Sequence, residues 1–210
     1  MTSGRALCIG VDTSERRDAL AEADARALAD TACRQGFEVT TLLLGTAATR
    51  ANVRAQLRTA AQACRPGDLF VLTFSGHGGE RGVWVLADGS FTDAEMREAL
   101  GAFQPGVRVF VVSDACNGGV PLEAPGEQPA TITASVLVFA SCGRTQLADA
   151  PGTPGHFTTA LLRTLSGAHI ATYRSVYERI AAGMPEHQQP GYFWVGTKDP
   201  LFERQRPFTI

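Results

Sequence analysis

Short apolar runs alternate with segments of helical periodicity along the chain. Apolar runs that end at polar or glycine-rich breaks predict strands at residues 6–11, 38–44, 68–74, 107–112, 135–140 and 192–195. Apolar residues at helical spacing predict helices at about 18–34, 49–63, 92–103, 157–165 and 173–182, and a small hairpin is expected around 83–89. This alternation predicts an α/β fold with a mostly parallel central sheet of about six strands and helices on both faces.

Two of the predicted strands lead to a reactive side chain. The strand at 68–74 leads to His77 and the strand at 107–112 leads to Cys116, each followed by a pair of glycines. The carboxyl ends of parallel strands share one edge of a sheet, and ligands bind there. A neutral imidazole can accept a thiol proton near pH 7, and the backbone amides of Gly78 and Cys116 are candidate oxyanion donors. The pair predicts a cysteine–histidine hydrolase site, with a buried structural His and Cys as the alternative.

Composition narrows the classes of partner and compartment. A chain of 210 residues with 44% hydrophobic content suits one sizeable domain. The net charge of −2 gives no reason to expect a nucleic acid or an anionic membrane as partner. No apolar run approaches the roughly 18 residues of a spanning helix, and the N-terminus lacks a signal-peptide pattern. The five cysteines are odd in number and contain no Cys-x-x-Cys pair, which favours a reducing, cytoplasmic compartment over a disulfide framework or a zinc site.

The stretches around the two reactive residues resemble the paired motifs of caspase-like peptidases. Phe-Ser-Gly-His-Gly-Gly at 74–79 and Ser-Asp-Ala-Cys-Asn-Gly at 113–118 are most similar to the metacaspase and bacterial orthocaspase branch. The resemblance covers nearly the whole chain. It implies one caspase-fold endopeptidase domain over 1–210, with His77 and Cys116 as its dyad. By the same resemblance, 1–116 corresponds to the large subunit, 117–134 to a loop and 135–210 to the small subunit.

Two carboxylates indicate the residue after which such an enzyme would cut. Asp114 lies two residues before Cys116, so we expect its side chain on the same face of the strand end, where it would hold a substrate Arg or Lys. Asp24 interrupts the apolar stripe of the helix at 18–34, which is costly unless the carboxylate is paired or faces a pocket. The resemblance to metacaspases implies that both line the pocket for the residue before the scissile bond. Caspases, which cut after aspartate, carry glutamine at the position of Asp114. Ser141, at the end of a predicted strand, is a third candidate substrate-binding residue.

Other features keep alternatives open. Arg16 and Arg17 lie roughly where caspases place an arginine that reads acidic substrates, so a peptidase with acidic preference is one alternative. A rotation of the first helix would leave Asp24 at its rim. A non-catalytic caspase-fold adaptor is a further alternative, although such proteins normally lack the His or the Cys. A nucleotide-binding domain is disfavoured because no Gly-x-Gly-x-x-Gly or phosphate-loop lysine follows the first strand.

The chain departs from metacaspases in two places that bear on geometry and cofactors. Asn117 stands where metacaspases usually have histidine, which affects the local loop and not the dyad. The loop at 117–134 contains only two acidic residues, Glu123 and Glu127, whereas calcium sites need several oxygen ligands. We therefore expect no metal and no calcium requirement. The expected partners are a protein substrate and a regulator or recruiting partner supplied in trans, in regulated proteolysis such as bacterial cell death or defence.

Processing of the chain can also be predicted. The segment between Cys116 and Arg144 contains no lysine or arginine. An enzyme specific for basic residues cannot cut itself there, so we expect it to act as one intact chain. Mapping the termini of active protein after incubation tests this expectation, and an obligatory cut within 117–143 contradicts it.

Overall fold

The structure is a computed structural model. It describes residues 2–12, 20–79, 83–115, 131–141, 156–167, 172–185 and 188–210, and of Val39 only the backbone. The strands are β1 (Gly4–Gly10), β2 (Val39–Leu44), β3 (Leu69–Gly76), β4 (Trp84–Leu86), β5 (Gly89–Phe91), β6 (Arg108–Ala115), β7 (Ser135–Ala140) and β8 (Gly191–Gly196). The helices are α1 (Leu20–Arg34), the 3-10 helix η1 (Gly45–Ala47), α2 (Arg50–Ala63), α3 (Asp93–Gly101), α4 (His156–Leu165), α5 (Tyr173–Gly183) and α6 (Pro200–Glu203).

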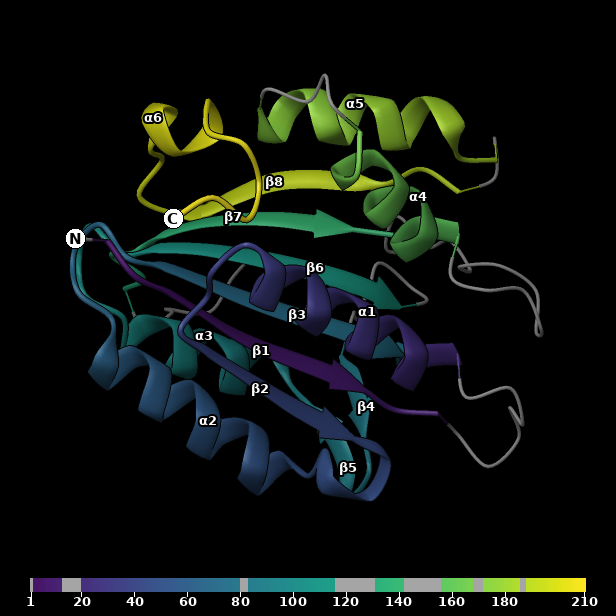
Figure 1. The fold of residues 1–210 in the computed structure, drawn as a ribbon. Helices are drawn as coiled ribbons and strands as arrows, with labels where there is room; N and C mark the ends of the chain where they lie inside the picture. The colour runs from purple at the N-terminus through teal and green to yellow at the C-terminus, as the bar shows by residue number, and fades with distance from the viewer. Residues whose placement is uncertain are drawn as a thin grey trace.

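A single central sheet organises these elements. Its strand order is β2-β1-β3-β6-β7-β8, in which β8 runs antiparallel to β7 and the other neighbours are parallel (Figure 1). The strands β4 and β5 form a separate antiparallel hairpin. The predicted α/β fold with a mostly parallel sheet of about six strands is therefore confirmed. The carboxyl ends of the parallel strands meet at one edge, which is where such sheets bind ligands.

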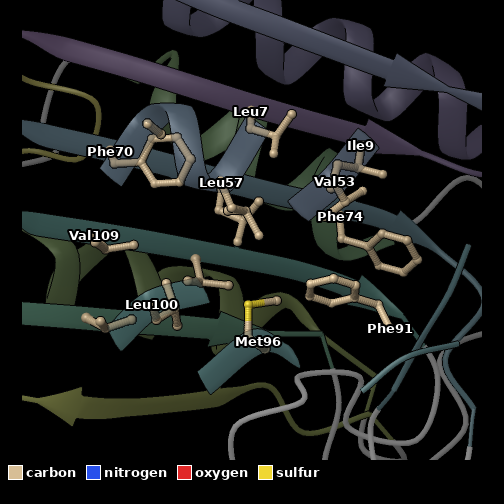
Figure 2. Packing of buried hydrophobic residues seen from close by; sticks show 14 of the residues in the cluster. Leu7, Ile9, Val53, Leu57, Phe70, Phe74, Phe91, Met96, Leu100 and Val109 are labelled. Carbon is tan, nitrogen blue, oxygen red and sulfur yellow. The ribbon is translucent and has the colours of Figure 1, made fainter. Parts of the chain in front are cut away.

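Helices cover both faces of the sheet. In Figure 1, α1, α4 and α5 lie over one face, and α2 and α3 lie over the other. Successive residues of β3 enter different cores: Leu69 and Val71 pack with α1 and α4, whereas Phe70, Leu72 and Phe74 pack with α2 and α3. Figure 2 shows the core beneath α2 and α3. Burial on both faces explains why the central strands appear in the sequence as nearly continuous apolar runs.

Some element boundaries differ from the prediction. β6 extends to Ala115, beyond the predicted end at residue 112, because Ser113 and Asp114 remain paired with Phe74 and Ser75 of β3. Because Ser113 and Asp114 are polar, the apolar pattern did not reveal that the strand continues through them. The short elements η1 and α6 were not predicted. The proposed loop at 117–134 lies largely outside the described residues, so the division into subunit-like parts stays a prediction.

The core under α2 provides a test of the packing. Leu57 is fully buried within it (Figure 2). Leu57→Ala is expected to lower the free energy of unfolding by about 2–5 kcal/mol, because it leaves a cavity among close-packed side chains. Leu201→Ala is the matched control, since Leu201 is 71% exposed, and should change it by less than about 0.5 kcal/mol. Urea unfolding measures both, and equal effects would contradict the packing described.

Candidate functional site

The predicted reactive residues follow two neighbouring strands in register. β3 and β6 pair in parallel, and their last paired residues are Gly76 and Ala115. His77 follows Gly76 directly in the sequence, and Cys116 follows Ala115. His77 is exposed at this edge, whereas Cys116 lies outside the described residues. The chain therefore leaves β3 and β6 at the same level of the sheet, directly before the two catalytic candidates.

The backbone around His77 is held by the β4–β5 hairpin. The amide of Val85 donates a hydrogen bond to the carbonyl oxygen of His77 (3.0 Å), and the amide of Gly79 donates to the carbonyl of Val83 (2.9 Å). Gly78, a predicted oxyanion donor, is buried and forms a β-bridge with Trp84. Main-chain hydrogen bonds therefore fix the backbone before His77, in β3, and after it, along the hairpin.

Trp84 connects this hairpin to the strand that precedes Cys116. Its side chain is fully buried and stacks on Phe74 of β3, with ring centroids 4.6 Å apart. The indole Nε1 donates a hydrogen bond of 3.0 Å to Oγ of Ser113 in β6. Buried indole N–H groups need such a partner, so this bond both satisfies the tryptophan and links the histidine segment to the cysteine strand.

Asp114 lies at the end of β6 and is 8% exposed. Its Oδ2 accepts two hydrogen bonds from Thr158 of α4, one from the backbone amide (3.0 Å) and one from the hydroxyl (2.7 Å). Thr158 lies in the first turn of α4, where backbone amides have no partner within the helix. The carboxylate of Asp114 is thus anchored to the N-terminus of α4.

Asp24 of α1 points toward β3 and not to the helix rim. Its Oδ2 accepts a hydrogen bond of 3.2 Å from the hydroxyl of Ser75. Burial and the negative charge of Asp114 raise the pKa of Asp24 to about 7; Ser75 acts in the opposite direction, and Asp12 adds to the rise. The carboxylate of Asp12 in turn accepts hydrogen bonds from backbone amides in the first turn of α1. Asp24 and Asp114, called here the acidic pair, therefore interact electrostatically, as their assignment to one site requires.

Ser141 directly follows β7 and supports the end of the neighbouring strand β6. Its side chain is fully buried, and its Oγ accepts a hydrogen bond from the amide of Ala115 and donates one to its carbonyl, both 3.1 Å long. The carbonyl of Ser141 accepts a bond from Nε2 of Gln188. These bonds fix the residue that immediately precedes Cys116. A direct role of Ser141 in substrate binding stays a prediction.

The described cysteines differ in environment. Cys8 and Cys64 are buried. Burial raises the pKa of the Cys8 thiol to about 11, and burial together with the charge of Asp68 raises the pKa of Cys64 to about 11. Thiols in such surroundings are poor nucleophiles near neutral pH. Cys33 is exposed on α1, and Cys142 lies outside the described residues.

The described part of the chain contains neither a cluster of metal ligands nor a membrane-spanning helix. There, no group of three or more His, Cys, Asp or Glu residues is arranged to hold a metal ion. Within the same residues, no helix has the length and apolar character needed to cross a membrane. The expectation that calcium is not required stays a prediction.

Sequence patterns located some parts of this site and missed others. His77, Gly78, Asp114 and Ser141 were expected at the strand ends, and the structure places them there. The contacts of Trp84 and Gln188 were missed. Ser75 was missed as well, although it belongs to the histidine motif. Thr158 had no signal at all, because its partner lies 44 residues away in the sequence.

Comparisons with known proteins agree with the fold. The profile of a family described as Caspase domain (Peptidase_C14) matches residues 3–206. Among solved structures, the chain is similar to the crystal structure of protein GSU0716 from Geobacter sulfurreducens, a Northeast Structural Genomics target. The identity is 33%, the match covers 99% of each chain, and the TM-score is 0.85. No curated protein matches the chain. The predicted caspase-like fold is confirmed, and the bacterial source of that structure is consistent with the predicted branch.

The acidic pair predicts a pH-dependent stability. Because the pKa of Asp24 is about 7 in the folded protein and about 3.9 in an unfolded chain, folding disfavours the ionised form. Stability should fall as pH rises from about 4 to about 7 and then level off. Asp24→Asn removes this charge, so its free energy of unfolding should exceed that of the wild type by about 1–3 kcal/mol more at pH 8 than at pH 5.

Urea unfolding at the two pH values measures this difference. Asp30→Asn is the matched control, because Asp30 is an exposed aspartate of the same helix. It should keep the wild-type pH dependence. An Asp24→Asn variant with the same slope as the wild type would show that Asp24 is not the desolvated group.

Proposed function

The chain belongs to the caspase-domain family, a family of cysteine peptidases, and we propose that it is an endopeptidase that cleaves after arginine or lysine with a His77–Cys116 dyad. The observation that carries this proposal is the register of β3 and β6. Gly76 pairs with Ala115. The residue after Gly76 is the proposed base, His77, and the residue after Ala115 is the proposed nucleophile, Cys116. The alignment of both residues with neighbouring strand ends supports their cooperation.

The residues at this edge supply the parts of a thiol peptidase mechanism. His77 would accept the proton of the Cys116 thiol, and the thiolate would attack the carbonyl carbon of the scissile bond. Backbone amides of Gly78 and Cys116 would stabilise the oxyanion of the tetrahedral intermediate. The imidazolium then protonates the leaving amine, and His77 next activates a water molecule that hydrolyses the thioester and releases the thiol.

The acidic pair supports a preference for a cationic substrate side chain. Burial and, after it, the negative charge of Asp114 raise the pKa of Asp24 to about 7. A substrate guanidinium or ammonium group would relieve the repulsion between the two carboxylates. It would also donate charge-assisted hydrogen bonds to both of them. Arg16 and Arg17, which suggested acidic preference, lie outside the described residues. The proposed preference for arginine or lysine thus rests on the acidic pair.

The biological setting is proposed by family resemblance. Regulated proteolysis in the cytoplasm, such as bacterial cell death or defence, fits a peptidase of this type, with a regulator or recruiting partner supplied in trans. We propose that catalysis needs no calcium or other cofactor.

Fluorogenic peptides that differ only in the residue before the scissile bond test the function. Wild type should turn over the Arg and Lys peptides and not those with Asp, Asn or Leu, equally with added calcium or with a chelator. His77→Ala should lower kcat/KM by about 10²–10⁴-fold, and Cys116→Ala should abolish turnover. Cys33→Ala is the matched control and should keep full activity, because Cys33 is an exposed cysteine on α1.

The outcomes separate the alternatives. Turnover after Asp but not after Arg would overturn the proposed specificity. Unchanged turnover in Cys116→Ala would overturn the dyad. A wild-type protein without turnover, whose biological effect survives Cys116→Ala, would favour the adaptor.

A further inference from the structure

We propose that Thr158 is the positioning residue of the specificity site, holding the carboxylate of Asp114 in the orientation that receives the cationic side chain of the substrate. This inference rests on the proposed function, since it concerns how the acidic pair recognises arginine or lysine. Thr158 itself need not touch the substrate. It would act through Asp114, from a helix that is remote in sequence from both reactive residues.

The geometry of the contact is specific. Both polar groups of Thr158, the amide at 3.0 Å and the hydroxyl at 2.7 Å, donate to the same oxygen of Asp114, Oδ2. Thr158 is fully buried and Asp114 is 8% exposed, so solvent competes little with either bond. Two donors from one residue restrict the rotation of the carboxylate about its side-chain bonds. α4 thereby constrains the orientation of Asp114.

The electrostatics of the contact favour a charged carboxylate. The amide of Thr158 is one of the first-turn amides of α4, which carry the positive end of the helix dipole. A hydroxyl hydrogen bond of 2.7 Å to a carboxylate is charge-assisted and stronger than a neutral one. Thr158 therefore stabilises negative charge on Asp114 at a buried position, where an unpaired charge would be costly.

The two members of the acidic pair are held differently. Asp24 accepts a hydrogen bond of 3.2 Å from the hydroxyl of Ser75, and its burial, followed by the charges of Asp114 and Asp12, opposes its ionisation. Asp114 has the two Thr158 bonds and the helix terminus in its favour. The two Thr158 bonds thus favour ionisation of Asp114 over that of Asp24. Loss of the hydroxyl should weaken recognition of positive charge while leaving the catalytic dyad intact.

The test compares two peptides that are identical except for arginine or its uncharged isostere citrulline before the scissile bond. Thr158→Val keeps the size of the side chain and removes the hydroxyl donor. We expect kcat/KM for the Arg peptide to fall about tenfold, mainly through KM, with a much smaller change for the citrulline peptide. Thr158→Ser, which restores the hydroxyl, should keep the Arg preference. Thr164→Val should leave both peptides unaffected, because Thr164 is a buried threonine of the same helix beyond the contact.

The selectivity ratio separates positioning from general damage. A merely structural role would lower turnover of both peptides equally in Thr158→Val, and that result would overturn the proposal. An unchanged Arg preference in Thr158→Val, or a lost preference in Thr158→Ser, would overturn it as well. Thr158→Ala replaces Thr158→Val if thermal unfolding shows that the latter does not fold.

A binding measurement distinguishes failure of this inference from failure of the proposed function. Affinities of the Arg and citrulline peptides are measured by titration calorimetry with Cys116→Ala and with Cys116→Ala/Thr158→Val. A weaker Arg preference in the double variant supports the inference even if the wild type shows no turnover. Equal preference in the two proteins overturns the role of Thr158 while leaving the peptidase assignment standing. Absence of any Arg preference in Cys116→Ala overturns the basic specificity and the inference together.

Discussion

The parallel pairing of β3 with β6 is the constraint on which the site depends. Both strands are buried on two faces, and alternate side chains belong to different cores. A shift of one residue would move Leu72 of β3 and Val111 of β6 from one core to the other and exchange every neighbour with them. The packing of the two cores therefore fixes the level at which both strands end. The level at which the histidine and cysteine segments leave the sheet therefore follows from hydrophobic packing along the two strands.

Side-chain bonds reinforce this alignment where the ladder stops. Trp84 connects the histidine segment to β6 through Ser113, and Ser141, which directly follows β7, holds Ala115. Each bond joins segments that come from different parts of the sequence. Because buried donors and acceptors without partners are costly, these contacts also favour one arrangement of the strand ends over others. The ends of β3 and β6 at the candidate site are thus supported by neighbouring segments.

The fold was predictable to the extent that burial alone determines it. Strands covered on both faces must be apolar throughout, and this made the central sheet visible in the sequence. Strand ends were less visible, since Ser113 and Asp114 continue β6 with polar side chains. Asp24 could be identified because a carboxylate in an apolar helical stripe is costly unless it is paired or faces a pocket. Thr158 could not be found, since a threonine in an amphipathic helix looks the same whether its hydroxyl meets water or a carboxylate.

Asp114 combines two tasks that other arrangements could separate. It docks the first turn of α4 onto the sheet, and under the proposed function its carboxylate would also receive the cationic side chain of the substrate. Replacing it by glutamine, as in caspases, would change the partner of α4 at the same moment as the charge of the site. A change in the charge of this strand end is therefore coupled to the packing of α4. The charge at this strand end is in that sense tied to the architecture, because the same carboxylate also holds a helix.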